Sequence, residues 1–119
     1  MRLNVLAQEF SVCKVSAFPG EISGVWFAAQ TDEEFSLVCQ SEFAPEDAVE
    51  VSGGWRAMRI EVVLDFSLVG ILAGISDALA RAQVGIFAVS TYNTDYILVK
   101  SADLARAVQA LQAAGYEVL

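Results

Sequence analysis

The second half of the chain carries the hydrophobic pattern that most limits its fold. Residues 55–65 contain many β-branched residues with partial alternation, which predicts a strand. Apolar residues then recur at helical spacing until a break at residues 82–85. These residues are Val69, Leu72, Ala73, Ile75, Leu79 and Ala80. Residues 86–90 and 95–99 follow as two strands, joined by a hairpin-like connection in which Asn93 can adopt a positive φ.

A second helix and a last strand complete this half of the chain. Ser101 is a typical N-cap residue, and Asp103 is expected in the first helical turn. One apolar stripe follows, and Gly115 ends the helix. The stripe consists of Leu104, Ala107, Val108 and Leu111. Residues 116–119 are expected to form a strand. The order strand, helix, strand, strand, helix, strand is that of the split βαβ, or ferredoxin-like, unit.

The first half resembles a reduced copy of the second. Three pairs of segments align at a constant offset: 24–26 with 85–87, 34–38 with 95–99, and 54–55 with 115–116. Residues 16–24, between candidate strands at 10–15 and at Val25, are too few and too rich in Gly and Pro for a full helix. Residues 45–48 have room for one helical turn.

We therefore predict an α+β fold of two tandem ferredoxin-like units, residues 1–55 and residues 56–119. The first unit is degenerate and lacks its first helix. A single α+β domain without a true repeat is the alternative.

Cysteine and histidine usage limits the chemistry that the chain can perform. Histidine, the commonest metal ligand and general base, is absent. Cys13 and Cys39 lie far apart in β-like stretches, so we expect buried free thiols, with a disulfide or a nucleophile as alternatives. No Cys-x-x-Cys spacing occurs, and we predict neither a metal site nor a cofactor.

The charge balance argues against two classes of partner. Fifteen acidic and seven basic residues give a net charge of −8, which repels phosphate backbones and anionic membranes. Nucleic acid and membranes are therefore not expected as partners. The longest uncharged apolar-rich run, residues 66–76, is about half of the roughly 20 residues of a spanning helix. Asn4, Gln8 and Glu9 interrupt any apolar N-terminal region, so we expect a cytoplasmic protein without a secretory signal.

Two segments carry a resemblance to a known family. Residues 65–72 read Asp-Phe-Ser-Leu-Val-Gly-Ile-Leu, and residues 90–99 read Ser-Thr-Tyr-Asn-Thr-Asp-Tyr-Ile-Leu-Val. They resemble the bacterial tandem ACT-domain proteins related to the CASTOR arginine sensors. The resemblance is dense over residues 55–119 and loose over residues 1–54, where it rests on Trp26, the strand at residues 33–39, and residues 54–55. It implies a regulatory, small-molecule-binding protein that is not an enzyme.

The resemblance also implies a site, in the crevice between neighbouring ACT units, that most often holds an amino acid. Backbone groups of Ser67, Leu68, Val69, Gly70 and Ile71 would bind the ligand at the start of the first helix. Free N–H groups there favour a carboxylate, and a residue without a Cβ allows close approach.

A second set of residues, Thr91, Tyr92, Asn93, Thr94 and Asp95, would line the pocket. In the arginine-sensing relatives an acidic residue at the place of Asp95 faces the guanidinium. By residue type alone, Gly70 is equally a loop glycine, Asn93 and Asp95 are equally turn formers, and Tyr92 is equally a packing residue.

The chain departs from those sensors in the number of its units. The sensors contain four ACT units, whereas this chain has one complete unit, so an equivalent crevice requires a second copy in a two-fold homodimer. In the first half, residues 30–34 stand at the place that residues 91–95 occupy in the second half. We expect no ligand in the first half. The protein would then regulate an enzyme or a transporter in trans.

Two other classes of function compete with this interpretation. One is a structural or oligomerisation domain with a vestigial pocket. The other is an enzyme that uses Cys13 or Cys39 as nucleophile, or Asp65 with Asp95 as a carboxylate pair. The enzyme is disfavoured because no histidine can act as base and no phosphate-binding loop is present.

Overall fold

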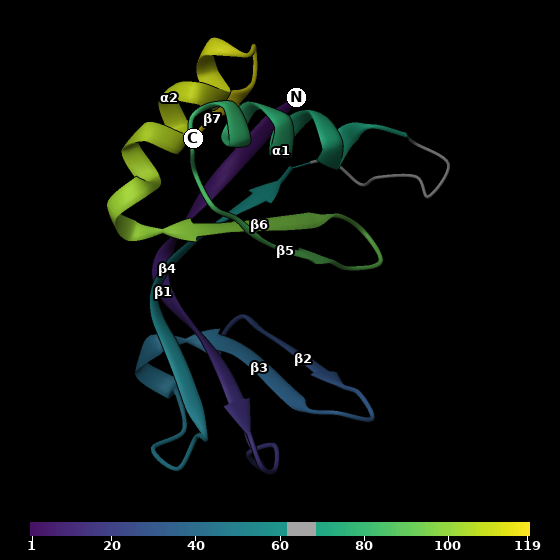
Figure 1. The fold of residues 1–119 in the computed structure, drawn as a ribbon, viewed down its shortest axis with the longest axis vertical. Helices are drawn as coiled ribbons and strands as arrows, with labels where there is room; N and C mark the ends of the chain where they lie inside the picture. Colours follow the sequence, from purple (N-terminus) through teal and green to yellow (C-terminus); the bar gives the residue numbers. More distant parts are fainter. Residues whose placement is uncertain (62–68) are drawn as a thin grey trace. The chain divides into compact units, whose positions relative to one another are not determined.

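The computed structural model describes residues 1–61 and 69–119 (Figure 1). The strands are β1 (Arg2–Val15), β2 (Trp26–Gln30), β3 (Phe35–Gln40), β4 (Glu50–Ile60), β5 (Phe87–Ser90), β6 (Asp95–Lys100) and β7 (Glu117–Val118). The α-helices are α1 (Ile71–Arg81) and α2 (Leu104–Ala113), and short 3₁₀ turns form η1 (Ser41–Phe43) and η2 (Ser101–Asp103). The predictions for Asp65, Ser67 and Leu68 lie outside the described residues.

The chain forms two compact units. Unit 1 consists of Met1–Ala7 and Arg56–Leu119, and unit 2 consists of Gln8–Trp55. Strands β1 and β4 each run through both units. β1 begins at Arg2, well before the expected start at residue 10, and its first residues pair in parallel with β7. The division at residue 55 into two domains stays a prediction.

Unit 2 is the reduced unit that the sequence predicts. Its strand order is β2-β3-β1-β4, and no α-helix occurs in residues 8–55. Unit 2 has a small core of Cys13, Val15, Leu37 and Cys39. Side chains of the loop of residues 16–25 and of the segment after η1 pack against this core. The rings of Phe18 and Phe35 stack with centroids 5.2 Å apart. The loop therefore covers the core in place of the missing helix.

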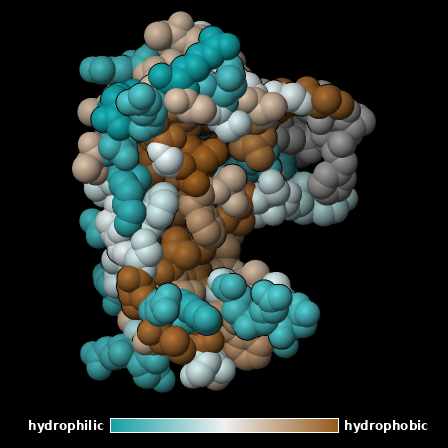
Figure 2. Space-filling view, viewed as in Figure 1, coloured by the Kyte–Doolittle hydropathy of each residue, from teal (hydrophilic) through white to brown (hydrophobic). Residues whose placement is uncertain are grey.

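Unit 2 also holds most of the acidic residues of the chain. Nine of the fifteen lie in residues 8–55, together with a single basic residue, Lys14. In Figure 2, hydrophilic side chains cover the end of unit 2 at which Figure 1 places the β2–β3 loop. This loop contains Asp32, Glu33 and Glu34. Because these side chains are exposed, they are solvated and need no partner within the chain.

Both cysteines lie in the core of unit 2 as free, buried thiols, which confirms the expectation. Burial raises the pKa of the Cys13 thiol above its usual value. Burial and the neighbouring Cys13 raise the pKa of Cys39 to about 11. At neutral pH both thiols are therefore protonated, and neither has the thiolate character of a nucleophile.

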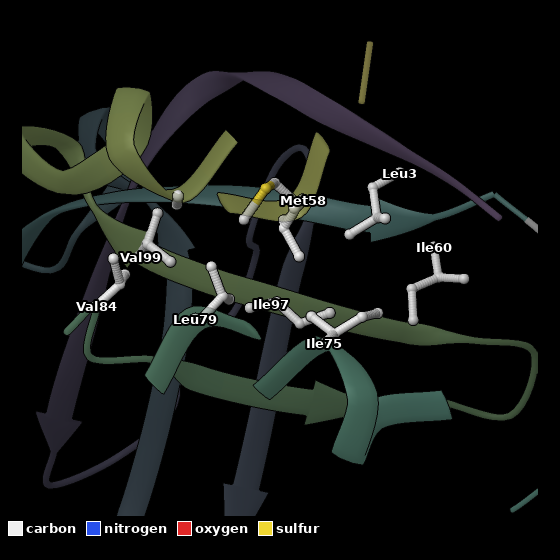
Figure 3. Close-up of a cluster of buried hydrophobic side chains, with 10 residues drawn as sticks. Leu3, Met58, Ile60, Ile75, Leu79, Val84, Ile97 and Val99 are labelled. Carbon is white, nitrogen blue, oxygen red and sulfur yellow. The ribbon is translucent and has the colours of Figure 1, made fainter. Parts of the chain in front are cut away.

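Unit 1 has the complete βαββαβ order. Its strands follow the order β1-β4-β6-β5, with β7 paired to the other edge of β1. Ile75 and Leu79 of α1 and Ala107 and Leu111 of α2 are fully buried. Figure 3 shows Ile75 and Leu79 in the same cluster as Ile97 of β6. The apolar stripes of the two helices thus form one core with the sheet.

The start of α2 differs from the prediction. The sequence predicts Ser101 as its N-cap, but Ser101–Asp103 form the 3₁₀ turn η2 and α2 begins at Leu104. Asp103 precedes the helix without a capping bond from its side chain, and its Oδ1 accepts a bond from Arg106 Nη2 at 3.1 Å. Within the described residues, no helix is both long enough and apolar enough to cross a membrane.

Candidate functional site

A threonine closes the β5–β6 hairpin that contains the predicted pocket stretch. The backbone N–H of Thr91 donates to the carbonyl oxygen of Thr94 at 2.9 Å. The Thr91 hydroxyl donates to the same oxygen, also at 2.9 Å. Ser90 pairs with Asp95 at the ends of the two strands. These bonds hold the loop in one conformation, as threonine does in ST turns.

The β2–β3 hairpin of unit 2 has the same closure. The backbone N–H of Thr31 donates to the carbonyl oxygen of Glu34 at 2.9 Å, and the Thr31 hydroxyl lies 3.4 Å from that oxygen. A 3₁₀ turn follows β3 just as one follows β6. The internal repeat is therefore visible in hydrogen bonds as well as in element order. Its offset is 60 residues (91 − 31), one fewer than the sequence alignment predicts, so Thr31 corresponds to Thr91 and the strand pair Gln30–Phe35 to Ser90–Asp95. The two loops differ in their central residues, Asp32 and Glu33 against Tyr92 and Asn93.

The β5–β6 loop lies against the end of β4 in unit 1. The Thr94 hydroxyl donates to the carbonyl oxygen of Ile60 at 2.8 Å, which joins the loop to that strand. A groove of about 330 Å³ opens there. Its walls are Arg59, Ile60, Glu61, Thr91, Asn93, Thr94 and Tyr96. The groove therefore brings together three of the five predicted pocket residues of this loop.

Tyr92 and Asp95 lie outside this groove. The Tyr92 side chain is 81% exposed, so it is not the packing residue that one alternative assumed. Asp95 is half-buried at the start of β6. Among the described residues, no basic side chain forms an ion pair with its carboxylate. Asp95 thus lies beside the loop, with no ion-pair partner in the described part of the chain.

The groove contains four residues that the sequence does not single out: Ile60, and the side chains of Arg59, Glu61 and Tyr96, which contact one another. Arg59 Nε donates to Glu61 Oε1 at 3.1 Å, and Arg59 Nη2 lies 3.1 Å from the same oxygen. The Arg59 guanidinium also stands 6.0 Å from the centre of the Tyr96 ring. Hydrogen bonding to Tyr96 and then to Glu61 raises the pKa of Arg59 above its usual value. The guanidinium is therefore a fixed positive charge in the groove.

A signal for two of these residues was present in the sequence. Alternate residues of a strand share a face, so Arg59 and Glu61 had to lie together on the face opposite Met58 and Ile60. Met58 and Ile60 are buried in the core of unit 1. What the alternation does not reveal is that the 91–94 loop packs beside this charged pair.

The start of α1 forms the other half of the predicted site. Gly70 precedes the helix with φ 86°, a left-handed conformation that suits glycine. A Cβ added there would meet no other atom within 4 Å. Val69 is 92% exposed. Val69, Gly70 and Ile71 are not among the residues that line this groove.

The groove presents polar and aromatic side chains to solvent. It offers one cation, one carboxylate, one amide side chain and one aromatic ring. In the described part of the chain, no cluster of Cys, Asp and Glu side chains is arranged to hold a metal ion.

Comparison with known proteins identifies the class. The model of the ACT domain family matches residues 50–113, and the chain therefore belongs to this family. Its fold is α+β, with tandem ferredoxin-like units of which the N-terminal one lacks its first helix, as predicted. In place of a second helix after β3, that unit has only the 3₁₀ turn η1. No curated protein matches the chain.

Three solved structures illustrate the likeness. Atu0741 from Agobacterium tumefaciens is 30% identical, with 99% of this chain and 91% of that chain covered and a TM-score of 0.90. VC0802 from Vibrio cholerae, a protein of unknown function described as a possible transport protein, is 21% identical, with coverages of 92% and 85% and a TM-score of 0.75. The ligand-free regulatory subunit of aspartate kinase from Thermus thermophilus is 12% identical, with coverages of 94% and 95% and a TM-score of 0.69. The last two likenesses concern the fold alone.

Proposed function

We propose that this protein is a regulatory ACT protein that binds an amino acid and performs no chemistry itself. The observation that carries the proposal is the groove beside the Thr91-closed loop, where Arg59, Glu61 and Asn93 offer polar contacts next to the Tyr96 ring. An amino acid combines a charged head group with a variable side chain and suits such walls. The fold likeness to a regulatory subunit of aspartate kinase supports a partner enzyme, and that to VC0802 supports a transporter.

The site is proposed to lie between ACT units of a homodimer. The complete unit occurs once per chain, and Val69, Gly70 and Ile71 do not line the groove of their own unit. A two-fold dimer allows the helix start of one copy, with Ser67 and Leu68, to face the groove of the other copy. Light scattering at micromolar concentration is expected to give the mass of a dimer or of a larger even oligomer. A monomer at every concentration would remove this intermolecular site.

A thermal-shift screen of the twenty standard amino acids separates this function from that of a structural domain with a vestigial pocket. A ligand that binds only the folded protein adds about 2.7 kcal/mol to the free energy of unfolding at a hundredfold excess over Kd. We expect at least one amino acid to raise Tm in this way. The structural domain predicts the same Tm with every amino acid.

Asp95 is the residue proposed to read a basic ligand side chain. Since its carboxylate has no basic partner among the described residues, Asp95→Asn is expected to weaken the binding of arginine or lysine by about 1.5–3 kcal/mol. The binding of neutral amino acids should hardly change. Calorimetry on both proteins measures the difference. Equal affinity of arginine for both would make Asp95 only a residue that starts β6.

The relation of residues 55–119 to the CASTOR-type sensors, the regulated partner and the cytoplasmic location stay predictions.

A further inference from the structure

Arg59 and Glu61 form an ion pair with spare hydrogen-bonding capacity on the wall of the groove. Their side chains are 33% and 30% exposed, so both are reachable from solvent. The two arginine contacts fall on the same carboxylate oxygen, Glu61 Oε1. A guanidinium carries five N–H donors and a carboxylate accepts at two oxygens. Donors of Arg59 remain for another molecule even with its hydrogen bond to Tyr96, and among the described residues no bond to the oxygen Oε2 of Glu61 occurs.

The guanidinium is held in place before any ligand arrives. Tyr96 lies under it at 6.0 Å from the ring centre, and Glu61 bonds it from the side. Tyr96 belongs to β6 and Glu61 directly follows β4, and these two strands are neighbours in the sheet. A side chain that is already ordered loses little conformational entropy when it binds a ligand. Arg59 is therefore better suited to recognition than an arginine that moves freely on the surface.

The charge of the pair selects the kind of ligand. A ligand with only a carboxylate would bind Arg59 but would be repelled by the Glu61 carboxylate about 3 Å away. A ligand with only an ammonium group would bind Glu61 but would be repelled by Arg59. A molecule with both groups on neighbouring atoms compensates both charges.

We propose that Arg59 and Glu61 bind the zwitterionic head group of an α-amino acid. The ligand carboxylate accepts hydrogen bonds from Arg59, and the ligand ammonium donates to Glu61. This assignment rests on the proposed function. It adds that Arg59 and Glu61 distinguish a free amino acid from derivatives in which the amino or the carboxyl group is blocked.

Unit 2 has a groove at the corresponding hairpin loop, but this groove lacks an arginine–glutamate pair. The groove, of about 260 Å³ beside the β2–β3 loop, is lined at the end of β1 by Lys14 and Ser16. Lys14 stands two residues before Ser16, as Arg59 stands two residues before Glu61. The other wall includes three carboxylates, those of Asp32, Glu33 and Glu34. With one ammonium group among several carboxylates, this groove would repel an amino-acid carboxylate, and we assign it no ligand.

The test uses calorimetry with the full chain and three forms of one amino acid. The amino acid is the one among the twenty standard L-amino acids that raises Tm most, and the other two forms are its N-acetyl derivative and its amide. Wild-type protein is expected to bind either derivative at least about tenfold more weakly than the amino acid. Arg59→Gln should weaken binding of the amino acid at least about tenfold. In Glu61→Gln, the affinity for the N-acetyl derivative should lie within about threefold of the affinity for the amino acid, because the variant has no carboxylate that pairs with an ammonium group.

Arg2 and Glu117 supply matched controls in the same unit. They form an ion pair at 3.6 Å, with side chains 54% and 58% exposed, and neither residue lines the groove. The Arg2 carbonyl oxygen accepts the backbone N–H of Glu61 at 2.9 Å, a bond that Arg2→Gln retains. Arg2→Gln and Glu117→Gln are expected to leave all affinities within about twofold. If Arg59→Gln failed to fold, the comparison of the three ligand forms on the wild-type protein would still test the inference.

Two outcomes separate this inference from the proposed function. If wild-type protein binds the amino acid and its N-acetyl derivative equally, or if a folded Arg59→Gln variant keeps full affinity, the head-group assignment is wrong and the regulatory function stands. If none of the twenty amino acids binds wild-type protein, both the function and the assignment are wrong.

Discussion

Replacing Gly70 by valine is expected to abolish amino-acid binding while most of the fold persists. Gly70 has φ 86° directly before α1, where backbone N–H groups lack helical partners. The space around a Cβ at this position is open, so a valine side chain would extend to where the ligand approaches the helix start in the proposed dimer. The left-handed conformation costs a residue other than glycine about 1–2 kcal/mol. Calorimetry and thermal unfolding measure the two effects separately.

Gly115 provides the matched control for this variant. It follows α2 with φ 99°, and a Cβ there would also meet no atom within 4 Å. Gly115→Val should therefore lower stability about as much as Gly70→Val and leave binding intact. If both variants lost stability and affinity to the same degree, Gly70 would be only a conformational glycine, and the helix start would have no place in the site.

Replacing Gly24 by alanine is expected to destabilise unit 2 by about 2–3 kcal/mol. Gly24 has φ 73°, and an added Cβ would overlap with Oε1 of Gln40. That oxygen accepts the backbone N–H of Val25 at 3.0 Å, and Gln40 is buried. Alanine would impose a left-handed strain and displace the glutamine from its bond. Urea unfolding gives the loss in the free energy of unfolding.

Gly20, in the same loop, is the control for Gly24. Its φ is not positive, and a Cβ added at this position would meet no atom within 4 Å. Gly20→Ala is expected to change stability by less than about 0.5 kcal/mol. A Gly24→Ala variant as stable as Gly20→Ala would mean that the Gln40 side chain does not hold the loop of residues 16–25.

The fold of unit 1 was predictable because its signals are local and agree with one another. The periodicity of Ile75 and Leu79 defined α1, and the alternation after Gly85 defined β5 and β6. The early part of β1 was not predicted, since Asn4 and Gln8 interrupt its apolar pattern. That segment is a strand because it pairs with parts of the chain far away in sequence: β4 lies beside β1 in the sheet, and β7 pairs with Arg2 and Leu3.

The candidate site was predictable only in part for a similar reason. Thr91, Asn93 and Thr94 were found through a resemblance in one continuous stretch, and they do line the groove. Arg59 and Tyr96 were missed because their importance depends on a tertiary contact, the bond from Thr94 to Ile60. A loop sequence indicates its own turn, whereas the strand end that faces it emerges only from the packed sheet.

Isothermal titration calorimetry tests amino-acid binding by this protein most directly. The titrant is the amino acid that raises Tm most, added to the full chain at a concentration where light scattering shows the oligomer. We expect a saturable heat with one amino acid bound per chain, as two symmetry-related sites in a dimer require. No saturable heat with any of the twenty amino acids at up to about 10 mM would contradict an amino-acid-binding function.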